Sequence, residues 1–259
     1  MSRKVSEPIM DFKNKSLAKG LKVLELLCEH QELTVSQLSE CLDLNRVTAH
    51  RYLAALRELG YVLMNSKGRF YLTSKVMGLG LRLADRFEIR NIARKHMIAL
   101  CTTFGETVNL GHWDGRSLML LDKVESQEIL RLNAPLGVSL PAYCTASGKA
   151  ILAFIPEMEL VEYFKTVNLE SFGPNTIVSV KQLRSELQVV RRQGYALEDE
   201  ELTVGLSCVA APVVDYRGYP SYSLSVAGPK ARITSELVSK IKDDLIQHCH
   251  DLSVELTSY

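Results

Sequence analysis

Residues 34–72, TVSQLSECLDLNRVTAHRYLAALRELGYVLMNSKGRFYL, have the pattern of a helix, a tight turn, a second helix and a two-stranded ribbon. Thr34 is a good N-cap for the first helix, because a threonine hydroxyl can accept a hydrogen bond from a free backbone N–H of the first turn. Helical spacing predicts that this helix buries Val35, Leu38 and Leu42. Asp43 and Leu44 then turn the chain. This order of elements is that of a winged helix-turn-helix.

The second helix is predicted to begin after the N-cap Asn45 and to end at Gly60, a suitable C′ residue. Its apolar stripe consists of Ala49, Leu53, Leu56 and Leu59. Polar side chains crowd its N-terminal end, which is the end that a recognition helix inserts into a major groove. Strands at 61–64 and 69–72 around the turn 65–68 would form the wing. The predicted DNA-binding residues are Thr34, Asn45, Arg46, Val47, Thr48, His50, Arg51, Lys67 and Arg69.

The distribution of charge supports DNA binding by this segment. Residues 1–90 hold fifteen Lys and Arg against ten Asp and Glu, whereas residues 91–259 hold sixteen against twenty. Between residues 45 and 69, five basic side chains are accompanied by a single acid, Glu58. Any small helical bundle can contain a helix-turn-helix, but a surface that is merely solvated usually mixes both signs. The excess of positive charge is that expected where phosphates are neutralised.

Length and composition limit the remaining possibilities. A chain of 259 residues with 46% apolar residues can bury two modest cores. Six cysteines lack paired spacing, so they are predicted to be buried free thiols in a reducing compartment. The N-terminus has no apolar signal segment, and no apolar run reaches the roughly 18 residues that a membrane span requires. We therefore expect a cytoplasmic protein without a membrane partner.

Four segments are predicted along the chain. They are a flexible arm at 1–15, the winged helix-turn-helix domain at 16–73, a linker helix at 74–89 and a second domain at 90–259. Ser16 should cap the first helix, which would run to Glu29 with a stripe of Leu17, Leu21, Leu24 and Leu27. The linker helix carries a near-heptad stripe that a lone helix cannot bury, which predicts dimerisation through it. That stripe consists of Val76, Leu79, Leu83 and Phe87.

The second domain has the pattern of an α+β fold. Apolar runs at 107–113 and 118–124 surround the turn 114–117, and runs at 207–214 and 219–227 surround the turn 215–218. Hairpins of this kind predict an antiparallel sheet. Helices are predicted at 90–104, 145–154, 157–165, 180–193 and 234–256. Hairpins with segregated helices favour α+β over a doubly wound parallel sheet.

The motifs tested for catalytic or metal chemistry mostly fail on spacing. Ser147-Gly148-Lys149 is not a phosphate loop, because Tyr143 and Ala150 occupy positions that require glycine and serine or threonine. The small residues from Thr145 to Gly148 instead open a helix, whose free N–H groups can bind an anion, although an ordinary capped helix is the alternative.

Three further patterns favour structural interpretations. His248 and His250 lie about 200° apart on a helix and cannot chelate together without a distant partner. The acids at 198–201 are more often a solvated turn than a catalytic pair. Cys208 has no basic neighbour in sequence, which favours an inert thiol. We predict no cofactor, no metal and no enzymatic activity.

These residues resemble the IclR family of bacterial transcriptional regulators over nearly the whole chain. The resemblance is carried by LNRVTAHRYL at 44–53, TASGKA at 145–150 and GLSCVAAPV at 205–213, with further short matches around 194–196 and 224–226. It implies a GAF-like effector-binding domain, homodimers or dimers of dimers, operator DNA as partner and a small carboxylate effector such as a sugar acid or keto acid. Repression is favoured over activation.

The resemblance also implies an effector site. Its residues would be Ile129, Leu132 and Leu140 from the sheet, the backbone N–H groups of Ala146 and Ser147, and Glu198, Leu206, Cys208 and Ser225. Ala227 stands where some relatives have a second serine, and Glu198 where some have an aspartate. Asn45, Arg46 and Val47 stand where serine and lysine are frequent. Two alternatives stay open: an enzyme that acts on a small carboxylic acid through the sheet domain, and an architectural DNA-binding protein without ligand.

Overall fold

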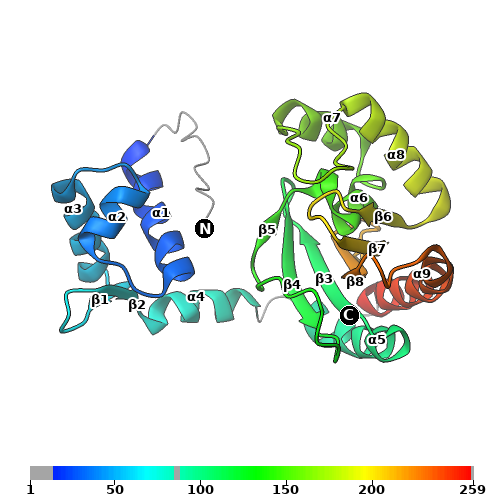
Figure 1. The fold of residues 1–259 in the computed structure, drawn as a ribbon, viewed down its shortest axis with the longest axis horizontal. Coiled ribbons are helices and arrows are strands. Elements are labelled where there is room, and N and C mark those ends of the chain that lie inside the picture. Colours follow the sequence, from blue (N-terminus) through cyan, green and yellow to red (C-terminus); the bar gives the residue numbers. More distant parts are fainter. Residues whose placement is uncertain (1–13, 85–87, 258–259) are drawn as a thin grey trace. The chain divides into compact units, whose positions relative to one another are not determined.

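The computed structural model describes residues 14–84 and 88–257, apart from the side chains of Leu81, Leu83 and Ala84. The chain divides into two compact units, Met1–Phe87 and Glu88–Tyr259 (Figure 1). The predicted arm at 1–15 lies almost entirely outside the described residues.

The first unit is a winged helix-turn-helix. Its elements are the helices α1 (Lys15–His30), α2 (Val35–Cys41), α3 (Arg46–Glu58) and α4 (Ser74–Ala84), with the hairpin strands β1 (Val62–Met64) and β2 (Phe70–Leu72) between α3 and α4. The strands pair antiparallel, with Leu63 opposite Tyr71. The predicted order of helix, turn, helix and ribbon is confirmed.

The helix ends of this unit follow from local chemistry. The Thr34 hydroxyl accepts from the Gln37 N–H at 3.3 Å, and Gln37 Oε1 accepts from the Thr34 N–H at 3.0 Å, which completes a capping box for α2. Asn45 Oδ1 accepts from the Thr48 N–H at 2.8 Å and caps α3. Gly60, at φ +77°, and Tyr61 donate back to the last turn of α3, as in a Schellman motif.

The core of the first unit corrects two details of the predicted stripes. The buried side chains of α1 include Val23 and Leu27, whereas Leu17 and Leu21 are 60% and 52% exposed. The helix is therefore rotated from the predicted orientation, and its N-cap is Asn14 instead of Ser16. Leu59 is also exposed, since it is the C-cap of α3. The buried core consists of Val23, Leu27, Leu33, Leu38, Ala49, Leu53, Val62 and Phe70.

The second unit contains a six-stranded, wholly antiparallel sheet in the order β5-β4-β3-β8-β7-β6. Its strands are β3 (Thr107–Trp113), β4 (Leu118–Val124), β5 (Ser139–Leu140), β6 (Ala196–Asp199), β7 (Leu206–Val213) and β8 (Tyr222–Pro229). Its helices are α5 (Ile89–Phe104), the short 3-10 helix η1 (Ala142–Cys144), α6 (Ala146–Leu152), α7 (Glu157–Thr166), α8 (Val180–Gln193) and α9 (Ser235–Thr257). The α+β prediction is confirmed. The two hairpins, β3-β4 and β7-β8, lie where they were predicted, but β5 and β6 were not predicted.

Helices cover both faces of this sheet. Helices α5 and α9 lie side by side on one face, and α6 packs against β7 and β8 on the other, with α8 behind it (Figure 1). Along β7, Cys208 and Ala210 belong to the core on the α6 side, whereas α9 packs on the other side, where the Cys249 thiol donates to the Ala211 carbonyl. Residues of even number on β7 therefore face α6.

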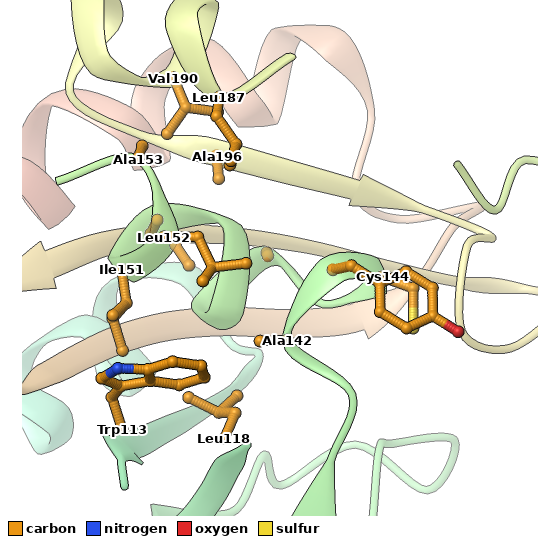
Figure 2. Packing of buried hydrophobic residues seen from close by; sticks show 14 of the residues in the cluster. Trp113, Leu118, Ala142, Cys144, Ile151, Leu152, Ala153, Leu187, Val190 and Ala196 are labelled. Atoms are coloured by element: carbon orange, nitrogen blue, oxygen red, sulfur yellow. The ribbon is translucent and has the colours of Figure 1, made fainter. Parts of the chain in front are cut away.

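The α6 side holds the larger core. Trp113 and Leu118 from the sheet pack beneath Ile151 and Leu152 of α6, and Leu187 of α8 closes the cluster (Figure 2). All seven residues of α6 are buried, including Lys149. The predicted burial of the cysteines is correct for Cys144, Cys208 and Cys249, but Cys28 and Cys41 are exposed and Cys101 is half-buried. Among the described residues no helix is long and apolar enough to cross a membrane.

Candidate functional site

The N-terminal end of α3 presents an exposed, basic surface. Asn45, Arg46, His50 and Arg51 are exposed, and Val47 is 72% exposed. Neither guanidinium group makes a hydrogen bond or ion pair with any residue in the described part of the chain. Two unpaired cations at one helix end are available to phosphates and to base edges.

The other predicted DNA-binding residues lie around this helix end. Thr48 is half-buried and its N–H is held by Asn45. Lys67 is exposed at the tip of the β1-β2 turn, and the Arg69 N–H bonds to Asn65 Oδ1 at 3.0 Å, which shapes that turn. The Thr34 side chain is engaged in the α2 capping box. The arrangement supplies a recognition helix with a positively charged wing.

In the second unit, the start of α6 lies against the sheet. Thr145 Oγ1 accepts from the Gly148 N–H at 3.2 Å, so the N–H groups of Ala146 and Ser147 have no partner within the helix. A side chain at Gly148 would meet the backbone of Ala142 at 2.3 Å, so only glycine allows η1 and α6 to approach this closely. The small residues of this segment therefore have a packing role as well.

The sheet presents two rows of side chains to α6, because residues paired across antiparallel strands share a face. One row is Glu198, Cys208, Ala227 and Thr107, on β6, β7, β8 and β3. The next row is Ala210, Ser225, Asn109 and Lys123, on β7, β8, β3 and β4. Three of the predicted effector residues, Glu198, Cys208 and Ser225, thus lie on one face within two adjacent rows.

The apolar residues predicted for the effector site differ in position and exposure. Ile129 and Leu132 lie in the loop between β4 and β5 and not in the sheet. The Ile129 side chain is 99% exposed, so its placement in the sheet was wrong, and its role in an effector site stays a prediction. Leu132 packs against the α6-side core, and its carbonyl accepts from Thr107 Oγ1 at 3.4 Å. Leu206 belongs to the same core, and Leu140 is half-buried on β5.

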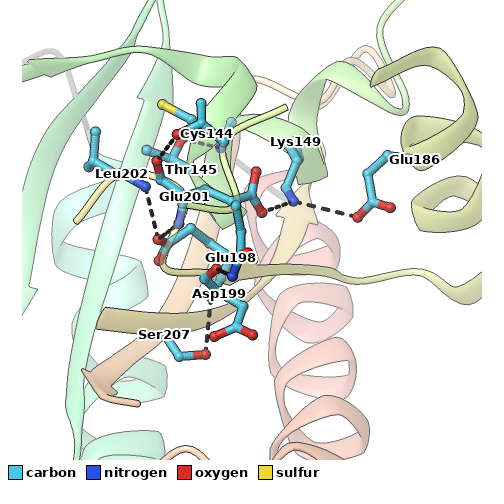
Figure 3. A network of polar contacts seen from close by, with 12 residues as sticks. Cys144, Thr145, Lys149, Glu186, Glu198, Asp199, Glu201, Leu202 and Ser207 are labelled. Atoms are coloured by element: carbon cyan, nitrogen blue, oxygen red, sulfur yellow. Dashed lines mark hydrogen bonds and ion pairs between the residues drawn. The ribbon is translucent and has the colours of Figure 1, made fainter. Parts of the chain in front are cut away.

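A buried ionic cluster closes the β6 end of the site (Figure 3). Lys149 Nζ lies 2.5 Å from Glu201 Oε1 and 3.5 Å from Glu186 Oε1. Glu198 Oε1 accepts from the N–H groups of Glu201 and Leu202 at 3.0 and 3.2 Å. Glu198 and Glu201 are 1% and 5% exposed, so the acidic run is not the solvated turn that was predicted. Glu198 is an inward-facing residue of β6, whereas Glu201 lies after the strand and is buried beyond Glu200, whose φ is +56°.

The ionisation of this cluster follows from its burial. Burial raises the pKa of Glu198, against the lowering effect of its two backbone hydrogen bonds. Burial also raises the pKa of Glu201, against the lowering effect of Lys149. The pKa of the Cys208 thiol is raised well above its usual value by burial and by the neighbouring Glu198. A neutral thiol here is consistent with the inert role that was predicted.

Sequence reasoning missed Asn109, Thr107 and Lys123, which the register brings into the two rows. Their only signal was a polar residue at alternate positions of predicted strands. It also missed the contact between His248 of α9 and His96 of α5, whose Nδ1 atoms lie 2.9 Å apart. Within residues 14–84 and 88–257, no three His, Cys, Asp or Glu side chains form a group that could hold a metal ion.

A basic recognition helix with a wing, followed by an antiparallel sheet domain, defines a two-domain DNA-binding regulator of transcription. The chain belongs to the IclR family: residues 16–64 match the IclR helix-turn-helix domain, and residues 81–254 match the bacterial transcriptional regulator IclR C-terminal domain. It is therefore a transcriptional regulator and not an enzyme.

Individual relatives agree. The transcriptional repressor AllR of Escherichia coli K12 is 30% identical over 233 residues, which cover 89% of this chain and 86% of AllR. The crystal structure of Thermotoga maritima IclR has a TM-score of 0.75 at 34% identity, covering 93% of this chain and 98% of that one. An IclR homologue from Microbacterium hydrocarbonoxydans, complexed with 4-hydroxybenzoate, shares the fold with a TM-score of 0.79 at 22% identity, covering 94% and 100%.

Removal of Arg46 or Arg51 should weaken operator binding by an order of magnitude or more. Each alanine variant loses a cation at the groove-facing helix end, at a cost of roughly 1–3 kcal/mol. Fluorescence anisotropy on operator DNA at several salt concentrations should also show a smaller salt dependence, because fewer counterions are released. Arg191→Ala, which removes an exposed arginine from the second unit, is the charge-matched control. Equal affinities for Arg46→Ala, Arg51→Ala and the control would reject this surface.

Glu198→Gln should stabilise the protein at pH 8 and have little effect near pH 4.5. Glu198 has a raised folded-state pKa, so between its ordinary pKa and that value the folded protein holds a proton that the unfolded chain has lost, and stability falls as pH rises. Glutamine keeps an acceptor for the two N–H groups but carries no charge. Each kcal/mol gained should raise the melting temperature by roughly 2–4 °C. Glu162→Gln, at an exposed position, should show no such trend; a pH-independent effect at Glu198 would contradict the assignment.

Proposed function

We propose that this regulator is a repressor whose affinity for operator DNA is altered by a small carboxylate metabolite, such as a sugar acid or keto acid, bound in the second unit. The observation that carries the proposal is that α6, whose first N–H groups lack a partner within the helix, packs on the face of the sheet that carries the row with Ser225.

The chemistry of that face suits a carboxylate with a polar substituent. Helix N–H groups without an intrahelical partner, at the positive end of a helix dipole, favour an anion. Ser225 is 5% exposed, and no described residue accepts or donates a hydrogen bond to its hydroxyl. Leu132, Leu206 and the neutral Cys208 supply apolar surface. A carboxylate ligand, 4-hydroxybenzoate, is reported for the Microbacterium homologue, and a repressor role for AllR; both are properties of those proteins.

Dimerisation would let two recognition helices contact two half-sites about one helical turn apart. We assign it to α4. Val76 is half-buried and Leu79 is 47% exposed within the first unit, so Leu79 has apolar surface left for a second copy. The side chains of Leu83 and Phe87, the other members of the predicted stripe, lie outside the described residues. Ligand binding would shift the population between dimer arrangements that do and do not match the operator.

Leu79→Asp should weaken both the dimer and operator binding, because a charge placed in an apolar helix contact must be desolvated. Analytical ultracentrifugation and anisotropy on operator DNA measure the two effects, with a dissociation constant at least tenfold weaker expected for each. Met77→Asp introduces the same charge on another face of α4, at a side chain that is 62% exposed. If Met77→Asp has the larger effect, or Leu79→Asp has none, the proposed stripe is wrong.

A carboxylate effector should raise the melting temperature and release operator DNA. At a hundredfold excess over its dissociation constant, a ligand that binds only the folded state adds about 2.7 kcal/mol of stability. Thermal shift with a panel of sugar acids and keto acids, followed by anisotropy on operator DNA, measures both. Ser225→Ala removes one hydroxyl contact and should reduce the response several-fold.

The matched control for Ser225→Ala is Ser223→Ala, two residues away on the same face of β8. Ser223 is 0% exposed and its hydroxyl oxygen is wholly enclosed, so a ligand cannot reach it, in contrast to the Ser225 hydroxyl. If no acid in the panel shifts melting, or if Ser225→Ala responds like wild type, the carboxylate site is not where we place it.

A further inference from the structure

We propose that Asn109 forms a second polar end of the effector site and selects a monocarboxylate that carries a neutral hydrogen-bonding group, such as an amide, over a dicarboxylate. This proposal rests on the proposed function, since it adds a specificity-determining residue to the same site. It narrows the effector from a small carboxylate to a monocarboxylate with a neutral hydrogen-bonding group.

The sheet register places Asn109 beside Ser225. In β3, Asn109 is paired directly with Ser225 of β8 on one side and with Lys123 of β4 on the other. Ser225 in turn pairs with Ala210 of β7, which belongs to the core beneath α6. Directly paired residues share a face, so the Asn109 side chain is on the α6 side of the sheet.

The Asn109 amide is nearly buried without a protein partner. The residue is 8% exposed, and its side chain makes no hydrogen bond to any residue in the described part of the chain. Its amide atoms are not among the wholly enclosed polar atoms of the described residues that lack a partner, so a ligand can reach them. The neighbouring Ser225 is 5% exposed, and its hydroxyl also makes no hydrogen bond to any described residue. Two adjacent, unpaired polar side chains on one face are what a bound ligand's polar group would satisfy.

Lys123 shows why the ligand's second group is neutral. Its Nζ lies 2.6 Å from Asn133 Oδ1, 3.0 Å from the Ala134 carbonyl and 2.8 Å from Glu125 Oε1. Three acceptors use the three N–H bonds of the ammonium group. Lys123 therefore holds the β4-β5 loop and is not available to pair with a second carboxylate at this end of the row.

An amide group complements Asn109 and Ser225 in both directions. The asparagine amide and the serine hydroxyl can each donate and accept. A carboxylate offers only acceptors and would lose its hydration without gaining a cation. An alkyl group would leave the Asn109 amide unpaired. The order of affinity expected from these contacts is amide acid first, with the diacid and the alkyl acid behind it.

A first experiment tests whether Asn109 has a structural role. Asn109→Leu keeps the branched shape of the side chain and its number of heavy atoms and removes no protein hydrogen bond, so the ligand-free variant should melt at or above the wild-type temperature. A melting temperature several degrees below wild type, measured without ligand, would assign Asn109 to folding and overturn the proposal.

The second experiment measures selectivity with matched acids of three lengths by thermal shift and isothermal titration calorimetry. The sets are malonamate, malonate and 3-methylbutanoate; succinamate, succinate and 4-methylpentanoate; and glutaramate, glutarate and 5-methylhexanoate. Within each set the carboxylate is kept and the far group changes from amide to carboxylate to isopropyl. In the length that fits, the amide should bind wild type roughly tenfold more tightly than either companion. Asn109→Leu should abolish this preference and favour the alkyl acid, while Ser223→Ala should keep it.

The outcomes separate the two proposals. If the three acids of the best set bind equally well, or the diacid binds best, and Asn109→Leu changes nothing, the carboxylate site stands and the role of Asn109 is refuted. If no acid of any set binds, the carboxylate effector itself is refuted and the role of Asn109 with it.

Discussion

The architecture of the second unit depends on the ion pair between Lys149 and Glu201. Lys149 lies in the middle of α6, a helix buried along its whole length, so its charge must be neutralised inside the protein. Glu201 provides the opposite charge from the turn after β6. Glu198 holds the same turn by accepting hydrogen bonds from two of its backbone N–H groups. Removal of one partner of such a pair typically costs about 3–5 kcal/mol. The pair therefore fixes where α6 begins relative to the sheet, which in turn fixes the position of any ligand held by its N–H groups.

Local chemistry made the DNA-binding unit predictable. Thr34, Asn45 and Gly60 each act within four residues of their own position, so their roles can be read without knowledge of the fold. The rotation of α1 could not be predicted in this way, because leucines occur on two faces and tertiary packing decides which is buried. Here Val23 and Leu27 face the core, and Leu17 and Leu21 do not.

The effector site was predictable only in part, because it is assembled from distant strands. Cys208 and Ser225 were found through the family resemblance, and their shared face is explained by the β7-β8 register. Asn109 lies on the same face because β3 pairs with β8, and a pairing between strands so far apart in the sequence cannot be predicted from a local pattern. Ile129 was also named through the family resemblance, which placed it in the sheet, but it lies in the loop between β4 and β5 with its side chain 99% exposed. The environment of the acidic run at 198–201 was predicted wrongly, because Glu198 faces inward from β6 and Glu201, in the turn after it, pairs with the buried Lys149.

Alternate residues of β7 and β8 point to opposite faces of the sheet, so neighbouring residues have different surroundings. Ala210 of β7 and Ser225 of β8 face α6. On the opposite face, Cys249 of α9 donates to the Ala211 carbonyl of β7. In the proposed effector site, a substitution at an α6-facing position would change ligand contacts, whereas one at the next residue would change the packing of the sheet against α9. Ligand preference could then change through single substitutions at every second position of these strands while the packing of α9 on the sheet is kept.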